Sequence, residues 1–99
     1  MEKLTPEEVE RSLANLPSWG MKGNAISRRY KLATFPDAIL FVRRVGDIAE
    51  SKNHHPFISI DYRFVTISYT SWHAGGITAI DFDSAALCDE AFTSQSDAK

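Results

Sequence analysis

Two adjacent histidines stand in the stretch "ESKNHHPFISI", residues 50–60 of a 99-residue chain that contains only three histidines. An imidazole can donate a proton near neutral pH and recover it, which is the requirement for general acid/base chemistry. Pro56 restricts His55 to an extended conformation. Glu50 lies about one turn before His54 and favours a protonated imidazole nearby. The stretch is therefore a candidate proton-transfer site.

Other roles compete for the same two side chains. A histidine that follows a helix can simply satisfy the last free carbonyl groups of that helix. The local pattern alone favours such capping over proton transfer, and proton transfer over metal binding. Metal binding is the weakest interpretation, because adjacent histidines in an extended chain point to opposite faces. Only His73 remains as a third ligand, and we expect no metal site.

Composition indicates one small domain without a strong electrostatic bias. The chain is 43% hydrophobic, enough for one modest core, and we expect a single domain over residues 1–99. The net charge of -2 favours neither nucleic acid nor an anionic membrane. The lone Cys88 cannot form an intrachain disulfide, and we expect a small buried helix residue. With no signal-peptide core and no apolar run long enough to cross a bilayer, we expect a soluble, cytoplasmic protein.

Three segments carry the same helix-opening signal. In each, a threonine precedes an acidic residue by three positions, so that its hydroxyl oxygen can accept from a free backbone N–H group. The pairs are Thr5 with Glu8, Thr34 with Asp37, and Thr78 with Asp81. The predicted helices cover residues 6–15, about 35–52, and 79–92. Asn53 is the expected left-handed C-cap of the second helix, and the polar tail within residues 92–99 is expected to be frayed.

Four strands are predicted between these helices. Residues 19–21 and 25–32 flank the turn "KGN", and residues 57–62 and 64–71 flank a tight turn. Alternation places Val65, Ile67 and Tyr69 on one apolar face of the last strand, and Tyr62 is expected in the core. The order of elements predicts an α+β domain, with a four-stranded, largely antiparallel sheet and three helices packed on one face.

A spaced set of residues extends from the histidine pair along the chain. It comprises Glu50, His54-His55-Pro56, Tyr62, Trp72 and Asp81, and it resembles the signature of the pterin-4a-carbinolamine dehydratase family. The opening "LTPEEVERSLANLPSWG", Phe35 at the entry to the second helix, and "GGIT" before the third are also similar to that family. The resemblance covers about residues 4–92.

The resemblance implies a hydro-lyase that dehydrates 4a-hydroxytetrahydropterin to quinonoid dihydropterin and serves tetrahydropterin recycling. It implies a homodimer or homotetramer, with a pterin substrate and neither metal nor organic cofactor. By resemblance His54, His55 and Asp81 are the catalytic residues, with His54 as the principal acid/base group. The expected substrate-binding residues are Glu50, Pro56, Ser71, Trp72 and His73, and the segment from Ser71 to Ala74 is expected to line the pocket.

Trp72 departs from the pattern of many family members, which place a third histidine at this position. By strand alternation Trp72 shares the polar face with Ser68 and Thr70, whereas His73 points the other way unless a bulge re-aims it. We hypothesise that Trp72 walls the flat pterin while His54 carries most of the proton transfer. Alternatively, Trp72 is only a packed aromatic residue. Asp81 can likewise be a helix cap or a partner of substrate or histidine.

A second class of function is also compatible with the resemblance. Some family members also act as dimerisation partners of a transcription factor, so this chain could be a non-catalytic pterin-binding or protein-dimerisation module. Nothing in the sequence resembles a DNA-reading element. The presence of Glu50, His54 and His55 together favours the enzyme, because a scaffold alone has no need of imidazoles in that arrangement.

Overall fold

The computed structural model describes residues 2–97. Its helices and strands follow the predicted order, with a short 3-10 helix, η1, added before the last helix. In chain order they are α1 (Pro6–Ala14), β1 (Gly20–Lys22), β2 (Ala25–Lys31), α2 (Phe35–Lys52), β3 (Phe57–Asp61), β4 (Phe64–Tyr69), η1 (Trp72–Ala74) and α3 (Ala79–Asp97).

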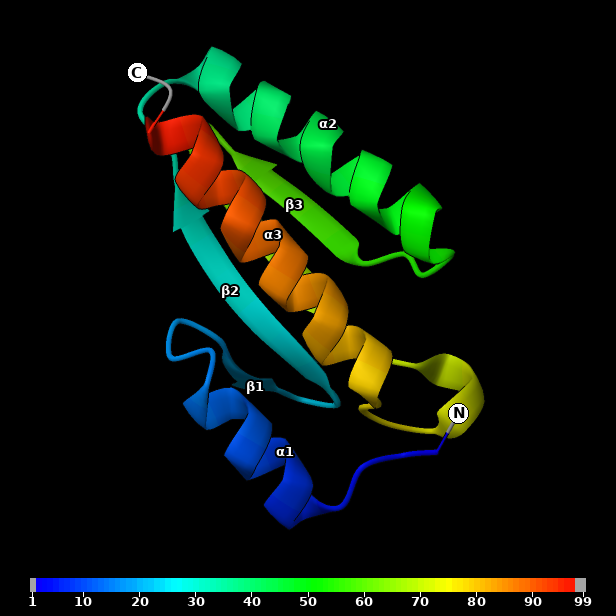
Figure 1. The fold of residues 1–99 in the computed structure, drawn as a ribbon. Coiled ribbons are helices and arrows are strands. Elements are labelled where there is room, and N and C mark those ends of the chain that lie inside the picture. The colour runs from blue at the N-terminus through cyan, green and yellow to red at the C-terminus, as the bar shows by residue number, and fades with distance from the viewer. Residues whose placement is uncertain (1, 98–99) are drawn as a thin grey trace.

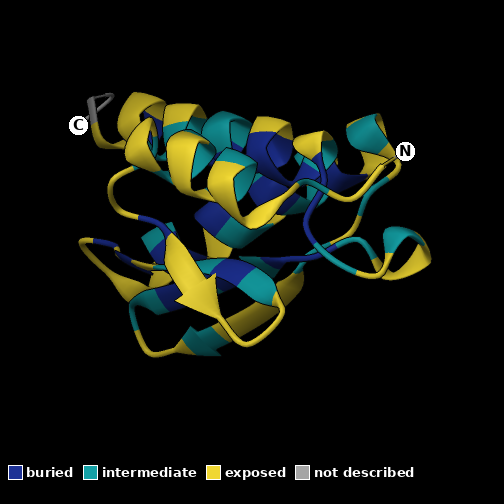
Figure 2. Cartoon of the chain, turned by 90° about the horizontal axis from the view of Figure 1, so that it is seen from below, coloured by how far each residue is buried: buried dark blue, intermediate teal, exposed yellow. Residues whose placement is uncertain are grey.

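The four strands form one antiparallel sheet in the order β1-β2-β4-β3. The helices cover one side of this sheet, with α2 and α3 running next to each other (Figure 1). Figure 2 shows the resulting two layers, with the sheet below the helices. The predicted α+β class and one-sided helix layer are confirmed. Within residues 2–97, none of the helices combines the length and the apolar character that crossing a membrane requires.

The core lies between the helices and the covered face of the sheet. Val65, Ile67 and Tyr69 are fully buried on that face, as the alternation of β4 predicts. The apolar stripe of α2 contributes Phe41 and Val45, which are also fully buried. Cys88 of α3 is buried as expected, and burial raises the pKa of its thiol to about 11. This thiol is therefore neutral at physiological pH.

The prediction for Tyr62 is wrong. Its side chain is 67% exposed, because the residue lies past the end of β3, in the turn to β4, with a positive φ of 55°. A residue in that conformation leaves the alternation of the strand and cannot continue its apolar face. Ile58 is partly exposed as well, since β3 is the edge strand.

The expected end of the third helix is also wrong. Instead of ending at residue 92 with a frayed tail, α3 continues to Asp97; residues 98–99 lie outside the described part of the chain. Gln95, only 3% exposed, donates a hydrogen bond from Nε2 to the backbone oxygen of Asp37 at 2.8 Å. This contact ties the last turns of α3 to the start of α2, which composition alone could not indicate.

Asp89 fixes the middle of α3 to the sheet. Its Oδ1 accepts hydrogen bonds from Trp19 Nε1 at 3.0 Å, Arg28 Nη1 at 2.7 Å and Tyr30 Oη at 2.5 Å. Burial, reinforced by the bond to Asp89, raises the pKa of Tyr30, so that its phenol remains a neutral donor. One carboxylate therefore joins α3 to β2 and to the segment that leads into β1.

Replacement of Asp89 should be strongly destabilising. In Asp89→Ala, Trp19 and Tyr30 keep buried donors without their acceptor, and Arg28 loses its ionic partner. We expect the free energy of unfolding to fall by about 3 kcal/mol, measured by urea denaturation. Glu90→Ala, at the exposed neighbouring position, should change it by less than about 0.5 kcal/mol. Equal losses in the two variants would contradict this account.

Candidate active site

The joint between α2 and β3 presents the two histidines. Asn53 adopts the left-handed conformation (φ 49°, ψ 44°) that ends α2, as predicted. The backbone N–H of His54 donates to the oxygen of Ala49 at 3.0 Å, so the main chain caps this helix end. Both imidazoles instead contact carboxylates. The interpretation of the imidazoles as helix caps is therefore wrong at this joint.

His54 is paired with Asp81 at the start of α3. The distance from His54 Nε2 to Asp81 Oδ1 is 2.5 Å, and Asp81 is fully buried. The second carboxylate oxygen, Oδ2, accepts from Ser71 Oγ at 2.8 Å and from the backbone N–H of Thr78 at 2.9 Å. Three donors thus surround one buried carboxylate, as a buried charge requires. Asp81 serves as helix cap and as histidine partner at once.

This network determines which nitrogen of His54 is free. An ionised carboxylate only accepts hydrogen bonds, so Nε2 carries the proton that is donated to Asp81. Nδ1 is then the nitrogen of a neutral His54 that can take a proton from a bound molecule. The imidazole side chain is only 16% exposed, so the pair lies mostly away from water. Such an arrangement suits a general acid/base group with a fixed tautomer.

His55 forms a separate pair with Glu50. The distance from His55 Nε2 to Glu50 Oε2 is 2.5 Å, but the two side chains are 60% and 78% exposed. Ion pairs with such exposure contribute little to stability. His54 and His55 therefore have different carboxylate partners. The described residues, 2–97, contain no group of three or more His, Cys, Asp or Glu side chains that could hold a metal ion.

A hollow of about 450 Å³ lies beside the histidines. It brings together His54, His55, Ser71, Trp72, His73 and Ala74 from the predicted set, and adds three residues that the sequence analysis did not assign to the site: Asn53, Thr70 and Ile80. Its lining comes from the end of α2, the chain after β4 and the start of α3. Glu50 and Pro56, also from the predicted set, do not line the hollow. Glu50 contacts the lining residue His55, and Pro56 follows His55 in the chain. A hollow of this volume accommodates a small organic ligand.

The alternation argument for Trp72 and His73 is wrong. The strand ends at Tyr69, and residues 72–74 form η1, so the alternating directions of a strand do not apply. Both side chains line the hollow. Trp72 is 73% exposed and meets Phe57 edge-on, with ring centroids 6.0 Å apart. It is therefore not a packed core aromatic.

Two further residues support the site and were not predicted. Thr78 is buried, and its hydroxyl lies 2.9 Å from Ser71 Oγ, next to Asp81. Tyr69 stacks on His54 with ring centroids 5.6 Å apart. The helix-opening pattern already marked Thr78, and strand alternation marked Tyr69, but each signal indicated only a structural role.

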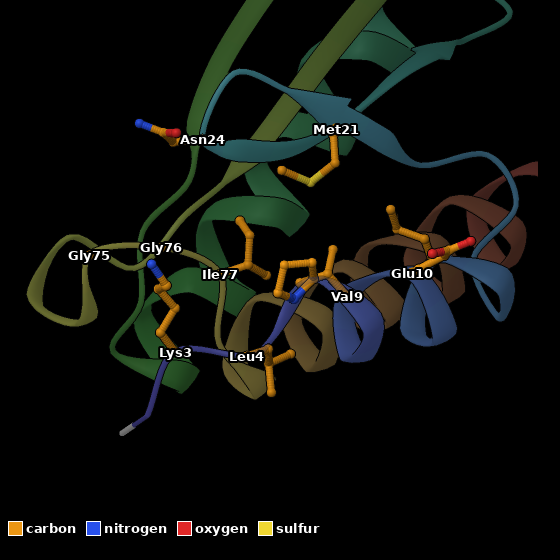
Figure 3. Close-up of a pocket in the computed structure, with 11 residues that line it drawn as sticks. Lys3, Leu4, Val9, Glu10, Met21, Asn24, Gly75, Gly76 and Ile77 are labelled. Atoms are coloured by element: carbon orange, nitrogen blue, oxygen red, sulfur yellow. The ribbon is translucent and has the colours of Figure 1, made fainter.

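A larger hollow of about 570 Å³ lies between the N-terminal segment, α1 and the loop after η1. Figure 3 shows mostly apolar side chains around it, such as Leu4, Val9 and Ile77, with Lys3 and Glu10 as its charged groups. Within residues 2–97, no histidine lines it. Because the acid/base groups gather in the smaller hollow, we assign the candidate active site to the smaller one.

Fold and site together define a small α+β protein with a buried aspartate–histidine pair beside a ligand-sized hollow. The family profile described as "Pterin 4 alpha carbinolamine dehydratase" matches residues 2–91. The chain therefore belongs to the pterin-4a-carbinolamine dehydratase family.

Individual relatives agree with this assignment. A protein of Roseiflexus sp. (strain RS-1), named "Putative pterin-4-alpha-carbinolamine dehydratase", is 44% identical over 89% of this chain and 95% of its own. A protein of Sulfurisphaera tokodaii with the same name is 39% identical over 94% of this chain and 100% of its own.

Solved structures share the fold. The "transcriptional coactivator/pterin dehydratase" of Brucella melitensis has a TM-score of 0.87 at 26% identity, covering 91% of this chain and 98% of its own. A "pterin dehydratase-like protein" described as a RuBisCO assembly factor of the alpha-carboxysome has a TM-score of 0.61 at 18% identity, over 74% of this chain and 84% of its own. The second shows the fold alone.

Asp81 should control the tautomer of His54. In Asp81→Asn the side-chain amide cannot accept from Nε2 and from the Ser71 and Thr78 donors in the same way. We expect nitrogen-detected NMR of the imidazoles to show the Nε2–H tautomer of His54 in the wild type and its loss in Asp81→Asn. Asp83→Asn, an exposed change on the same helix, is the control. An Nδ1–H tautomer in the wild type would refute the assignment.

Proposed function

We propose that this protein dehydrates 4a-hydroxytetrahydropterin to quinonoid dihydropterin and water, with His54 as the general acid/base group. The observation that supports this most is the His54–Asp81 pair beside the hollow. The family assignment supplies the class of reaction. A role in tetrahydropterin recycling belongs to the same proposal, and the expected homodimer or homotetramer remains a prediction.

The reaction needs two proton movements and no redox step. The carbon–oxygen bond at C4a breaks, and a proton must reach the leaving hydroxyl group to release water. The lone pair of the neighbouring ring nitrogen forms the new double bond, and that nitrogen loses its proton. One proton is given and one is taken, so a single imidazole can perform both steps and return to its starting state.

The surrounding residues have distinct proposed roles. Asp81 holds Nε2 of His54, so Nδ1 is the atom that exchanges protons with the substrate. When the His54 imidazole carries a second proton for donation, the carboxylate of Asp81 stabilises its positive charge. His55, supported by Glu50, orients the pterin from the exposed side of the hollow, and Ser71 fixes Asp81.

Trp72 is proposed to receive the flat face of the pterin. Its large exposed fraction leaves the indole free to stack with a ligand, and Phe57 supports it edge-on. His73 lines the same hollow and could replace the third histidine of other family members. We assign it only a contact role, because the buried Asp81 contacts His54, whereas His73 has no carboxylate partner within residues 2–97.

Direct assay tests the reaction. The 4a-carbinolamine is generated in situ and its dehydration followed in the presence of the protein. We expect acceleration by the wild type and a fall of kcat by about 10² to 10⁴ in His54→Ala. Ser59→Ala, on the open face of the edge strand, should retain full activity. If the wild type leaves the spontaneous rate unchanged, the protein is not a dehydratase and the binding-module alternative takes its place.

A second pair of variants separates Trp72 from His73. Stacking of a flat heteroaromatic ring on an aromatic side chain contributes about 1 to 3 kcal/mol. Trp72→Ala should therefore raise KM about tenfold with a smaller change in kcat, and His73→Ala should change both constants by less than about threefold. A large kcat loss in His73→Ala alone would show that His73 is the second proton-transfer group. If Trp72→His, added to His73→Ala, restored the lost kcat, the role of a second proton-transfer histidine would be confirmed.

A further inference from the structure

The ring of Tyr69 is stacked, with a lateral offset, against the His54 imidazole. The two ring planes differ by only 14°, with the centroids 5.6 Å apart. Tyr69 is fully buried and is the last residue of β4, whereas His54 follows the end of α2. The stack therefore joins the two elements on either side of the candidate active site.

Tyr69 is itself firmly held. Its backbone pairs with Ile26 of β2, its ring lies 6.3 Å from that of Trp19, and its hydroxyl lies 3.5 Å from Cys88 Sγ. Burial raises the pKa of Tyr69 above its ordinary value. Since burial also keeps the Cys88 thiol protonated, His54 rests on a neutral aromatic surface that is anchored in the core.

The hydrogen bond to Asp81 only partly restrains the rotation of the His54 ring. In an imidazole, both nitrogens lie off the axis of the bond that joins the ring to Cβ, and Nδ1 lies farther from it than Nε2. Rotation about this bond, which has a broad energy minimum in histidine, therefore moves Nδ1 farther than Nε2. A hydrogen bond at Nε2 limits this rotation, but it holds the direction of Nδ1 less tightly than the position of Nε2.

We propose that Tyr69 is a positioning residue, which fixes the ring plane of His54 and so aims Nδ1 at the bound substrate. A flat ring packed in parallel against the imidazole opposes the rotation that Asp81 permits. This inference rests on the proposed function. The hydroxyl of Tyr69 has no part in it beyond holding the tyrosine ring in place.

Kinetics of two substitutions test the role of the ring. Tyr69→Phe keeps the flat surface, and we expect kcat within about threefold of the wild type. Tyr69→Leu removes the flat surface but keeps a buried apolar side chain. Because misplacement of a catalytic group by about 1 Å can cost a factor of about 10², we expect kcat to fall about 10- to 100-fold with KM within about threefold. Tyr69→Met, a flexible apolar replacement, gives the same test if the leucine variant does not fold.

Tyr30→Leu is the matched control for loss of a buried tyrosine. Tyr30 lies on the same covered face, but its ring packs against Phe41 and Phe92, at 4.6 and 5.0 Å between centroids, away from His54. We expect Tyr30→Leu to lower the melting temperature at least as much as Tyr69→Leu, with kcat close to the wild type when both are assayed well below their melting temperatures. An equal kcat loss in the control would overturn the proposal.

A measurement without substrate separates this inference from the proposed function. The His54 and Tyr69 rings are stacked, so the ring current of Tyr69 should shift the NMR signals of the carbon-bound ring protons of His54. We expect this shift in the wild type and Tyr69→Phe, and its loss in Tyr69→Leu or Tyr69→Met. If the shift persists in the variants without a ring, the positioning role is wrong even in an active dehydratase. If the shift is lost as expected but the wild type has no activity, the ring contact stands and the proposed function fails.

Discussion

The structure of the site depends on the burial of one carboxylate. Asp81 has no solvent-exposed surface, and an isolated buried charge would be strongly unfavourable. Its neighbours compensate by converging on it: an imidazole from the end of α2, a hydroxyl from the chain after β4 and a backbone N–H from the start of α3. The three donors belong to three different segments of the chain. Because the buried carboxylate of Asp81 needs all three donors, it fixes the relative positions of these segments.

Farther along α3, Asp89 also accepts hydrogen bonds from several donors, and this second cluster joins the helix to the sheet. It gathers donors from β2 and from the segment before β1, about two helical turns from Asp81. The helix is thus held by one aspartate where it meets the histidine joint and by another where it crosses the sheet. Apolar packing of residues such as Phe82, Ala85 and Cys88 fills the space between these polar ties.

Local rules predicted much of the fold, because its signals repeat along the chain. Threonine caps and the left-handed Asn53 marked helix ends, and alternation in β4 placed Val65, Ile67 and Tyr69 correctly. The errors have two causes, a tertiary contact in one case and a local backbone conformation in the other. Gln95 extends α3 through a contact with the start of α2, and Tyr62 leaves the strand through a positive φ.

The site was predictable in its residue types but not in its pairing. Spacing singled out His54, His55 and Asp81, yet the partition into His54 with Asp81 and His55 with Glu50 depends on how α2 and α3 meet. The directions of Trp72 and His73 could not be derived either, because η1 interrupts the strand. Tyr69 illustrates a more general difficulty. A residue on the apolar face of a strand gives the same sequence signal whether it packs against leucine or against an imidazole.

The double role of Asp81 limits how this protein can change. The oxygen that accepts from Thr78 belongs to the same carboxylate that holds His54, so the first turn of α3 and the His54–Asp81 pair share one group. A substitution of Asp81 would change the partner of His54 and remove the acceptor of the Thr78 backbone N–H at the same time. Variation in the site is therefore easier at its exposed wall, around Trp72 and His73, where side chains can be exchanged without altering where a helix begins.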